Sequence, residues 1–125
     1  MNGRVFVIGL GLIGGSLALC IKKEHKDATI IGYDIHQEQA RLAKMLGVVD
    51  EVASHIAEGA KTADLIIISA PVIETEAIIH LLSEQLLNPD VIITDTGSTK
   101  SKIVANASCL KKKGYTFIGG HPMAG

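Results

Sequence analysis

Two side chains in the last third of the chain have types suited to acid–base chemistry. Ser98 follows the apolar segment 90–95, and His121 follows the segment 115–120. An imidazole has an ordinary pKa of about 6.5, so near neutral pH it can take a proton from a substrate hydroxyl. A serine hydroxyl beside it can orient the imidazole or hold the substrate oxygen. The two residues are therefore a candidate pair for removing a proton from an alcohol that is being oxidised.

A second candidate site lies near the start of the chain, in the sequence GLGLIG at residues 9–14. In a strand–turn–helix that binds a dinucleotide, the first glycine permits the tight turn and the second lets the backbone approach a pyrophosphate. The third glycine lets helix and strand pack closely. Gly9, Gly11 and Gly14 have this spacing, and Leu12 and Ile13 between them are expected to contact the cofactor as well. The pyrophosphate would meet N–H groups at the positive end of the helix.

An acidic residue at the end of the next expected strand indicates which dinucleotide is bound. Asp34 lies twenty residues after Gly14. A carboxylate in this place accepts hydrogen bonds from both ribose hydroxyls and repels a 2′-phosphate. Ile35 and His36, which follow it, provide no arginine for such a phosphate. We therefore expect NAD as the cofactor, although a plain strand–helix turn with a surface aspartate is the simpler alternative. We expect no metal site.

These residues need a scaffold, and the sequence alternates short β-branched runs with longer helical patterns. Strands are expected at 4–9, 28–34, 48–53, 63–71, 90–95 and 115–120, and helices at 12–24, 36–46, 73–87 and 100–113. This alternation predicts parallel strands joined by right-handed crossovers. We expect an α/β fold, a Rossmann-type doubly wound parallel sheet of about six strands, in one domain over residues 1–125.

The expected fold brings the candidate residues to one edge of the sheet. In open parallel sheets, ligands bind beyond the carboxyl ends of the strands. Ser98 and His121 follow neighbouring strands and so are expected on the same rim, while Ala70, Pro71 and Val72 are expected to line the crevice as part of the cofactor site. A helix N-cap is a simpler role for Ser98 and is compatible with the first. For His121, the alternative is a loop histidine without a chemical role.

Composition excludes some classes of protein. Apolar residues make up 47% of the chain, charged residues 20%, and the net charge is −1, which predicts a folded domain without a nucleic-acid partner. The apolar run 5–21 contains several glycines, so we expect no membrane span. Cys20 and Cys109 are far apart in the sequence, which favours free thiols and a cytoplasmic setting.

Three motifs resemble those of the prephenate dehydrogenase family, which includes arogenate dehydrogenases. They are GLGLIGGSLA at 9–18, TDTGSTK at 94–100 and GGHPMAG at 119–125. The resemblance covers essentially the whole chain and assigns it to the family's N-terminal nucleotide-binding domain. It implies the NAD-dependent oxidative decarboxylation of prephenate to 4-hydroxyphenylpyruvate, on the route to tyrosine.

The resemblance also implies roles for individual residues. His121 matches the family's catalytic histidine, which takes the proton of the substrate's ring hydroxyl. Ser98 matches the serine that contacts both that histidine and the hydroxyl. The three glycines of the first motif and Asp34 match the family's cofactor positions.

The family continues beyond this point with a helical C-terminal domain that builds a homodimer and closes the substrate site. We therefore expect the chain to be a fragment that binds NAD and oxidises prephenate poorly or not at all. Prephenate carries two carboxylates, which arginine binds best, and the chain has only Arg4 and Arg41, both expected far from the catalytic pair. The residues that bind these carboxylates are expected outside 1–125. Another NAD-dependent small-acid dehydrogenase and a non-catalytic dinucleotide sensor remain alternatives.

Overall fold

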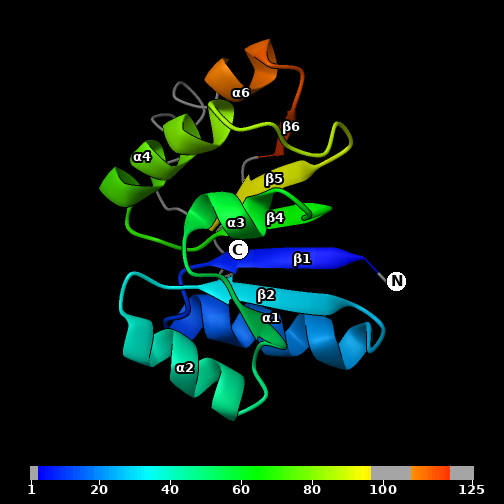
Figure 1. Cartoon of the computed structure of the whole chain (residues 1–125), viewed down its shortest axis with the longest axis vertical. Helices are drawn as coiled ribbons and strands as arrows, with labels where there is room; N and C mark the ends of the chain where they lie inside the picture. The colour runs from blue at the N-terminus through cyan, green and yellow to red at the C-terminus, as the bar shows by residue number, and fades with distance from the viewer. Residues whose placement is uncertain (1–2, 97–107, 119–125) are drawn as a thin grey trace.

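A computed structural model describes residues 3–96 and 108–118 of the chain (Figure 1). Six parallel strands form a single sheet in the order β3-β2-β1-β4-β5-β6. The strands are β1 (Arg4–Ile8), β2 (Thr29–Tyr33), β3 (Glu51–Val52), β4 (Leu65–Ile68), β5 (Ile92–Asp95) and β6 (Thr116–Ile118). The strand order reverses between β1 and β4, as in a Rossmann-type fold, so the predicted fold class is confirmed.

Helices cover both faces of the sheet, and each face has its own apolar core. The helices are α1 (Leu12–Glu24), α2 (Gln37–Met45), α3 (Ile56–Ala60), α4 (Val72–Ser83) and α6 (Ser108–Lys112). One core contains residues of α1 and α2, and the other contains residues of α3, α4 and α6. In Figure 1, α4 and α6 lie beside the β5–β6 end of the sheet, and α2 lies beside β2 at the other end.

The central strands β1 and β4 carry continuous apolar runs, VFVI and LIII, because both faces of the sheet are covered. In β1, Val5 and Val7 belong to the core beneath α1 and α2, while Phe6 and Ile8 belong to the opposite core. All four side chains are buried. Successive side chains of a strand point to opposite faces, so a parallel strand covered on both faces needs such a continuous apolar run.

Helix α4 is shorter than the sequence predicts. It ends at Ser83 instead of residue 87. The Tyr115 hydroxyl accepts a hydrogen bond from the Leu87 N–H at 2.9 Å and donates one to the Gln85 carbonyl at 3.1 Å. These bonds tie the segment after the helix to the loop before β6, so its backbone groups are satisfied without another helical turn.

Helix α3 is not among the helices expected from the sequence, and its cap explains why it forms. Ser54 donates to Glu58 Oε1 from its backbone N–H at 2.7 Å and from its hydroxyl at 3.1 Å. His55 Nδ1 accepts from the Glu58 N–H at 3.3 Å, so this histidine caps the helix. The backbone N–H of Ser54, and then its hydroxyl, lower the pKa of Glu58. Such reciprocal bonds satisfy N–H groups that a helix start leaves without acceptors.

Two further structural findings concern membrane-spanning helices and the two cysteines. Among the residues that the structure describes, no helix is long and apolar enough to cross a membrane. Neither Cys20 nor Cys109 forms a disulfide.

Candidate functional site: a cofactor cleft at the carboxyl edge of the sheet

The loops that follow β1, β2 and β4 lie on the same side of the sheet, opposite the edge where β1 begins (Figure 1). A pocket of about 280 Å³ opens among these loops. Its lining residues come from β1, β2, α2, α4 and the loops between them: Ile8, Gly9, Gly11, Tyr33, Asp34, Ile35, His36, Gln39, Ser69, Ala70, Pro71, Glu74 and Ile78. Five of the residues predicted for cofactor binding are therefore brought together here.

The three motif glycines are glycines for different reasons. Gly9 has a φ of +99°, and a Cβ on it would overlap the Ser69 carbonyl oxygen. A Cβ on Gly14 would overlap the carbonyl oxygen of Gly9. At Gly11, in contrast, a Cβ would meet no heavy atom within 4 Å. The fold itself requires the first and third glycines, whereas only a molecule that approaches from outside can require the second.

The start of α1 presents free N–H groups beside this open position. Gly11 is the N-cap residue, no side chain in the described part of the chain caps the helix, and its first turn holds no acidic residue. The first N–H groups of a helix have no acceptor inside it and carry a partial positive charge. Leu12 and Ile13 lie in this first turn and are 88% and 56% exposed. This end of α1 is therefore suited to an anion.

Asp34 uses both carboxylate oxygens to hold the loops on either side of it. Its Oδ2 accepts from the Leu10 N–H at 2.8 Å, and its Oδ1 accepts from the His36 N–H at 2.9 Å. A carboxylate oxygen accepts about two hydrogen bonds, so each keeps a lone pair for a ligand hydroxyl. The carboxylate thus has a fixed position with accepting capacity left at the pocket wall.

Gln39 also lines the site, although no motif in the sequence predicts it. Its Nε2 donates to the Leu10 carbonyl oxygen at 3.0 Å, so both backbone groups of Leu10 are bonded by side chains that follow β2. The Gly9 N–H also donates to the Tyr33 carbonyl at 2.7 Å. Together these bonds fix the glycine turn against β2 and α2. The only sequence signal was a polar residue one turn into a helix that follows Asp34.

The loop after β4 is held by a buried threonine. Thr75 is fully buried, and its hydroxyl donates to the Ala70 carbonyl at 3.0 Å. Its N–H donates to the Pro71 carbonyl at 2.8 Å. These bonds place Ala70 and Pro71 at the pocket, and α4 begins directly afterwards at Val72.

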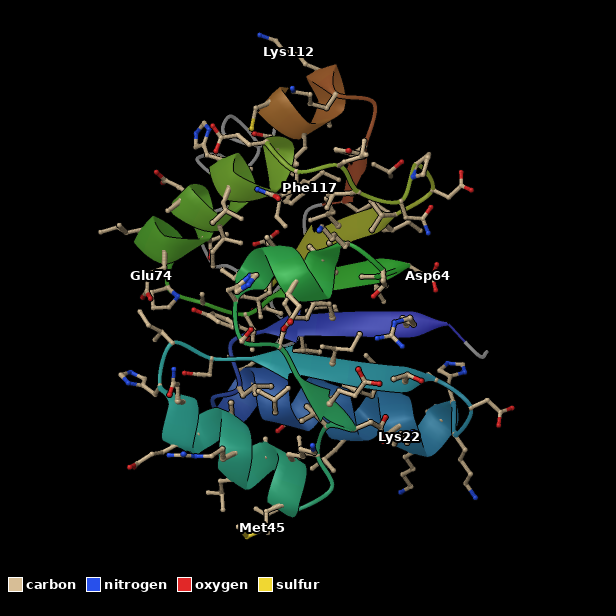
Figure 2. The ribbon with its side chains drawn as sticks, viewed as in Figure 1. Lys22, Met45, Asp64, Glu74, Lys112 and Phe117 are labelled. Atoms are coloured by element: carbon tan, nitrogen blue, oxygen red, sulfur yellow. The ribbon has the colours of Figure 1, made fainter. Side chains whose placement is uncertain are left out.

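The charges at the pocket are carboxylates. Glu74 lines it from the first turn of α4, and Figure 2 shows this residue at the carboxyl edge, with Asp64 at the opposite edge of the sheet. Among the lining residues there is no lysine or arginine. The walls therefore suit neutral hydroxyl and amino groups, while the phosphate-binding character belongs to the start of α1.

The predicted catalytic pair lies outside the described residues. Ser98 falls in the segment 97–107 and His121 in the segment 119–125, so their assignment stays a prediction. The strands that precede them are neighbours, with Thr94 paired to Ile118 in parallel register. Among the described residues, no cluster of three or more His, Cys, Asp or Glu side chains could hold a metal ion.

The strand order, the glycine turn and the carboxylate at the end of β2 define a Rossmann-type nucleotide-binding domain. A family model described as "Prephenate dehydrogenase, nucleotide-binding domain" matches residues 17–125. The chain belongs to this family.

Several known proteins are similar to the chain. Over 100% of its own length, the chain is 46% identical to a prephenate dehydrogenase of Bacillus subtilis. It is 42% identical to a prephenate dehydrogenase of Lactococcus lactis over 98% of its length. A crystal structure of prephenate dehydrogenase from Aquifex aeolicus, in complex with hydroxyphenyl propionate and NAD+, has a TM-score of 0.87 and 35% identity, and covers 100% of the chain. The chain spans 34% of the length of each bacterial relative and 43% of the crystallised chain.

Proposed function

We propose that the chain binds NAD and supplies the cofactor half of the active site of a prephenate dehydrogenase. The observation that carries this proposal is the open backbone at Gly11, beside the uncapped start of α1 and within the same pocket as Asp34. A pyrophosphate at α1 and a ribose at Asp34 use the two kinds of polar group that these loops offer. The NAD+ named with the crystallised relative supports the same cofactor.

The pocket has a place for each part of the adenosine half of the cofactor. The free lone pairs of Asp34 accept from the two ribose hydroxyls, and Gly11 lets the pyrophosphate approach the backbone. Ile35 and Ile78 line the same pocket and provide apolar surface for the adenine ring. The nicotinamide half then extends past Pro71 toward the ends of β4 and β5, because ligands cross the sheet at its switch point.

In the proposed reaction, bound NAD supplies the hydride acceptor, and residues of this chain handle the proton. His121 takes the proton of the ring hydroxyl of prephenate, and Ser98 holds both the imidazole and the hydroxyl oxygen. The ring carbon that bears the oxygen loses its hydride, and the ring carboxylate leaves as carbon dioxide because an aromatic ring results. The product is 4-hydroxyphenylpyruvate.

The rest of the active site is proposed to come from outside residues 1–125. Prephenate carries two carboxylates, and the chain has two arginines. Arg4 begins β1, at the edge of the sheet opposite the cleft, and is bonded to Thr62 and Glu51. Arg41 lies on α2 and lines a pocket with Asp34, next to β2 and β3, at the end of the sheet away from β5 and β6. We therefore propose that residues beyond this chain bind the carboxylates, in a helical domain that also forms a homodimer, and that the chain alone turns over little or no prephenate.

Two alternatives make different predictions for the same experiment. Arogenate differs from prephenate away from the reacting ring, so a comparison of the two substrates on the full-length protein separates these activities. A non-catalytic dinucleotide sensor would bind NAD without oxidising either substrate. Because the relatives with 46% and 42% identity are both named prephenate dehydrogenase, prephenate is the first substrate to test.

The catalytic assignment is tested in the full-length protein with His121→Asn. The variant should lower kcat for NADH formation by about 10²–10⁴-fold, because it removes the general base. Its dissociation constant for NAD should stay close to that of the wild type, since the adenosine and pyrophosphate contacts are untouched. An unchanged kcat would show that His121 does not carry the proton transfer.

A further inference from the structure

A second pocket adjoins the cofactor cleft on the other side of the loop that joins β2 to α2. Its volume is about 280 Å³, and it shares Tyr33, Asp34 and Ile35 with the cofactor cleft. The rest of its wall comes from α2 and from the end of β3: Gln37, Ala40, Arg41, Val52, Ala53 and Ser54. We call it the Arg41 pocket.

The Arg41 pocket contains one cation and one anion among its lining residues, Arg41 and Asp34. Within the described part of the chain, Arg41 forms no hydrogen bond or ion pair. The other arginine, Arg4, is by contrast engaged, with Nε bonded to Thr62 at 3.0 Å and one NH₂ group bonded to Glu51 at 3.2 Å. The guanidinium of Arg41 therefore keeps its donors available for a ligand.

Asp34 connects the two pockets. In the proposed function, its carboxylate accepts the ribose hydroxyls of the cofactor. A phosphate on the 2′-oxygen would then lie against Asp34, at the boundary with the Arg41 pocket. A guanidinium matches the geometry of a phosphate with paired N–H donors, and Ser54 and Gln37 add neutral polar groups to the same wall.

We propose that the Arg41 pocket is a latent 2′-phosphate subsite, in which Arg41 binds the additional phosphate of NADP once the charge of Asp34 is removed. In the wild type, repulsion by Asp34 outweighs this attraction, so the protein selects NAD. The inference rests on the proposed NAD site. Ile35 and His36, next to Asp34 in the sequence, offer no arginine for this phosphate, but Arg41, seven residues after Asp34, is brought to the pocket by α2.

The test is a set of calorimetric titrations of NAD and NADP into the full-length protein, read as the ratio of the two dissociation constants. The variants are Asp34→Asn, Asp34→Asn with Arg41→Ala, and Asp34→Asn with Lys44→Ala. The asparagine keeps an oxygen that can accept from the Leu10 N–H. Lys44 is the matched control, because it is an exposed cation on the same helix and does not line the pocket.

We expect Asp34→Asn to shift the ratio toward NADP by about tenfold or more, and Arg41→Ala to reverse about tenfold of that shift, as loss of a charge-assisted phosphate contact would. The Lys44→Ala control should change the ratio by less than about twofold, since an exposed charge that does not line the pocket is screened by solvent and salt. The inference is overturned if Arg41→Ala and Lys44→Ala have the same effect, or if Asp34→Asn gains no affinity for NADP.

Two checks keep the outcomes distinct. If Asp34→Asn fails to fold by circular dichroism, the same series is built on Asp34→Ser. If the wild type binds no NAD, the proposed function and the inference both fail. If it binds NAD and Arg41 has no effect on the ratio, only the inference fails.

Discussion

At the scale of single residues, the fold requires some of the glycines at the cleft, while another is required only if a ligand binds. Gly9 and Gly14 are closed off by neighbouring backbone, whereas Gly11 faces open space. Asp34 and Gln39 act on the same residue from two sides, since one accepts from the Leu10 N–H and the other donates to its carbonyl. The proposed cofactor contacts therefore depend on a turn whose position is fixed before any ligand arrives.

Gly11→Ala should leave the fold intact and weaken NAD binding. The free protein has room for the methyl group, but the pyrophosphate approaches the same place, so the dissociation constant should rise by about tenfold or more. Gly14→Ala is the matched comparison. It should lower the free energy of unfolding by roughly 1–3 kcal/mol, because its Cβ would overlap the Gly9 carbonyl. Calorimetry and urea denaturation measure the two effects, and wild-type affinity in Gly11→Ala would contradict the proposed approach of the pyrophosphate.

Gln39→Leu should weaken NAD binding indirectly, because Gln39 holds the glycine turn and is not proposed to contact the cofactor's phosphates. It removes the donor to the Leu10 carbonyl, a bond worth about 1 kcal/mol, so the dissociation constant should rise by about fivefold. Gln39→Lys retains a donor and should recover part of the loss. Lys44→Leu on the same helix serves as the control. Equal affinities in Gln39→Leu and the control would show that the turn does not depend on this bond.

At the scale of elements, α1 is joined to the sheet at the end far from the cleft. Asp50 Oδ2 accepts from Lys22 Nζ of α1 at 2.9 Å and from the Ile30 N–H of β2 at 2.9 Å. Lys22 also donates to the Ala28 carbonyl at 2.8 Å. Burial raises the pKa of Asp50, but the bonds from Ile30 and Lys22 outweigh it, so the pKa lies below its ordinary value.

The lowered pKa of Asp50 predicts how the stability of the fold depends on pH. The folded state favours the ionised form of Asp50. The contribution of this charge to the free energy of unfolding is therefore present above the ordinary aspartate pKa and is lost as the pH falls below about 4. Asp50→Asn should lower the free energy of unfolding at neutral pH by roughly 0.5–1 kcal/mol, since the pair is partly exposed and screened. The loss should shrink below about pH 4.

Urea denaturation at several pH values measures this effect. Asp27→Asn is the control, because Asp27 is an exposed carboxylate in the α1–β2 loop, which also contains Ala28, and it forms no hydrogen bond to the described residues. A loss of stability in Asp50→Asn that is the same at every pH would show that the charge of Asp50 is not responsible.

The sequence was sufficient to predict the elements that carry a strong local pattern. The run LIII of β4 and the strand–glycine–helix pattern of β1 and α1 depend on neighbours in the chain, and the structure confirms them. The end of α4 and the existence of α3 depend on partners that local periodicity does not show. Tyr115, distant in the sequence, binds the segment after α4, and a five-residue helix such as α3 is too short for a clear periodic signal.

The site shows the same division. The glycine spacing and Asp34 follow from a motif in the sequence, and the structure places Gly9, Gly11 and Asp34 in one pocket. Gln39 and Arg41 could not be found in this way, because their relevance depends on which face of α2 turns toward the glycine loop and toward β3. Ser98 and His121 stay predictions that rest on the sequence motifs.

At the scale of the whole molecule, the two edges of the sheet have different contents. The edge where the strands begin holds side-chain bonds between structural residues, such as the Arg4 N–H to Asp64 at 2.8 Å and Asn88 to Asp64 at 3.1 Å. The carboxyl edge holds the cleft, the start of α1 and the ends of the strands that precede Ser98 and His121. The proposed cofactor site therefore lies at the carboxyl edge of a chain that spans about a third of its relatives' length.

The most direct measurement is a calorimetric titration of NAD and of NADP into the protein, with Asp34→Ser as the control. We predict saturable binding of NAD, binding of NADP that is weaker by at least about tenfold, and a smaller difference between the two in Asp34→Ser. A protein that is folded by circular dichroism and binds neither dinucleotide, or binds both equally well, would contradict the proposed cofactor site.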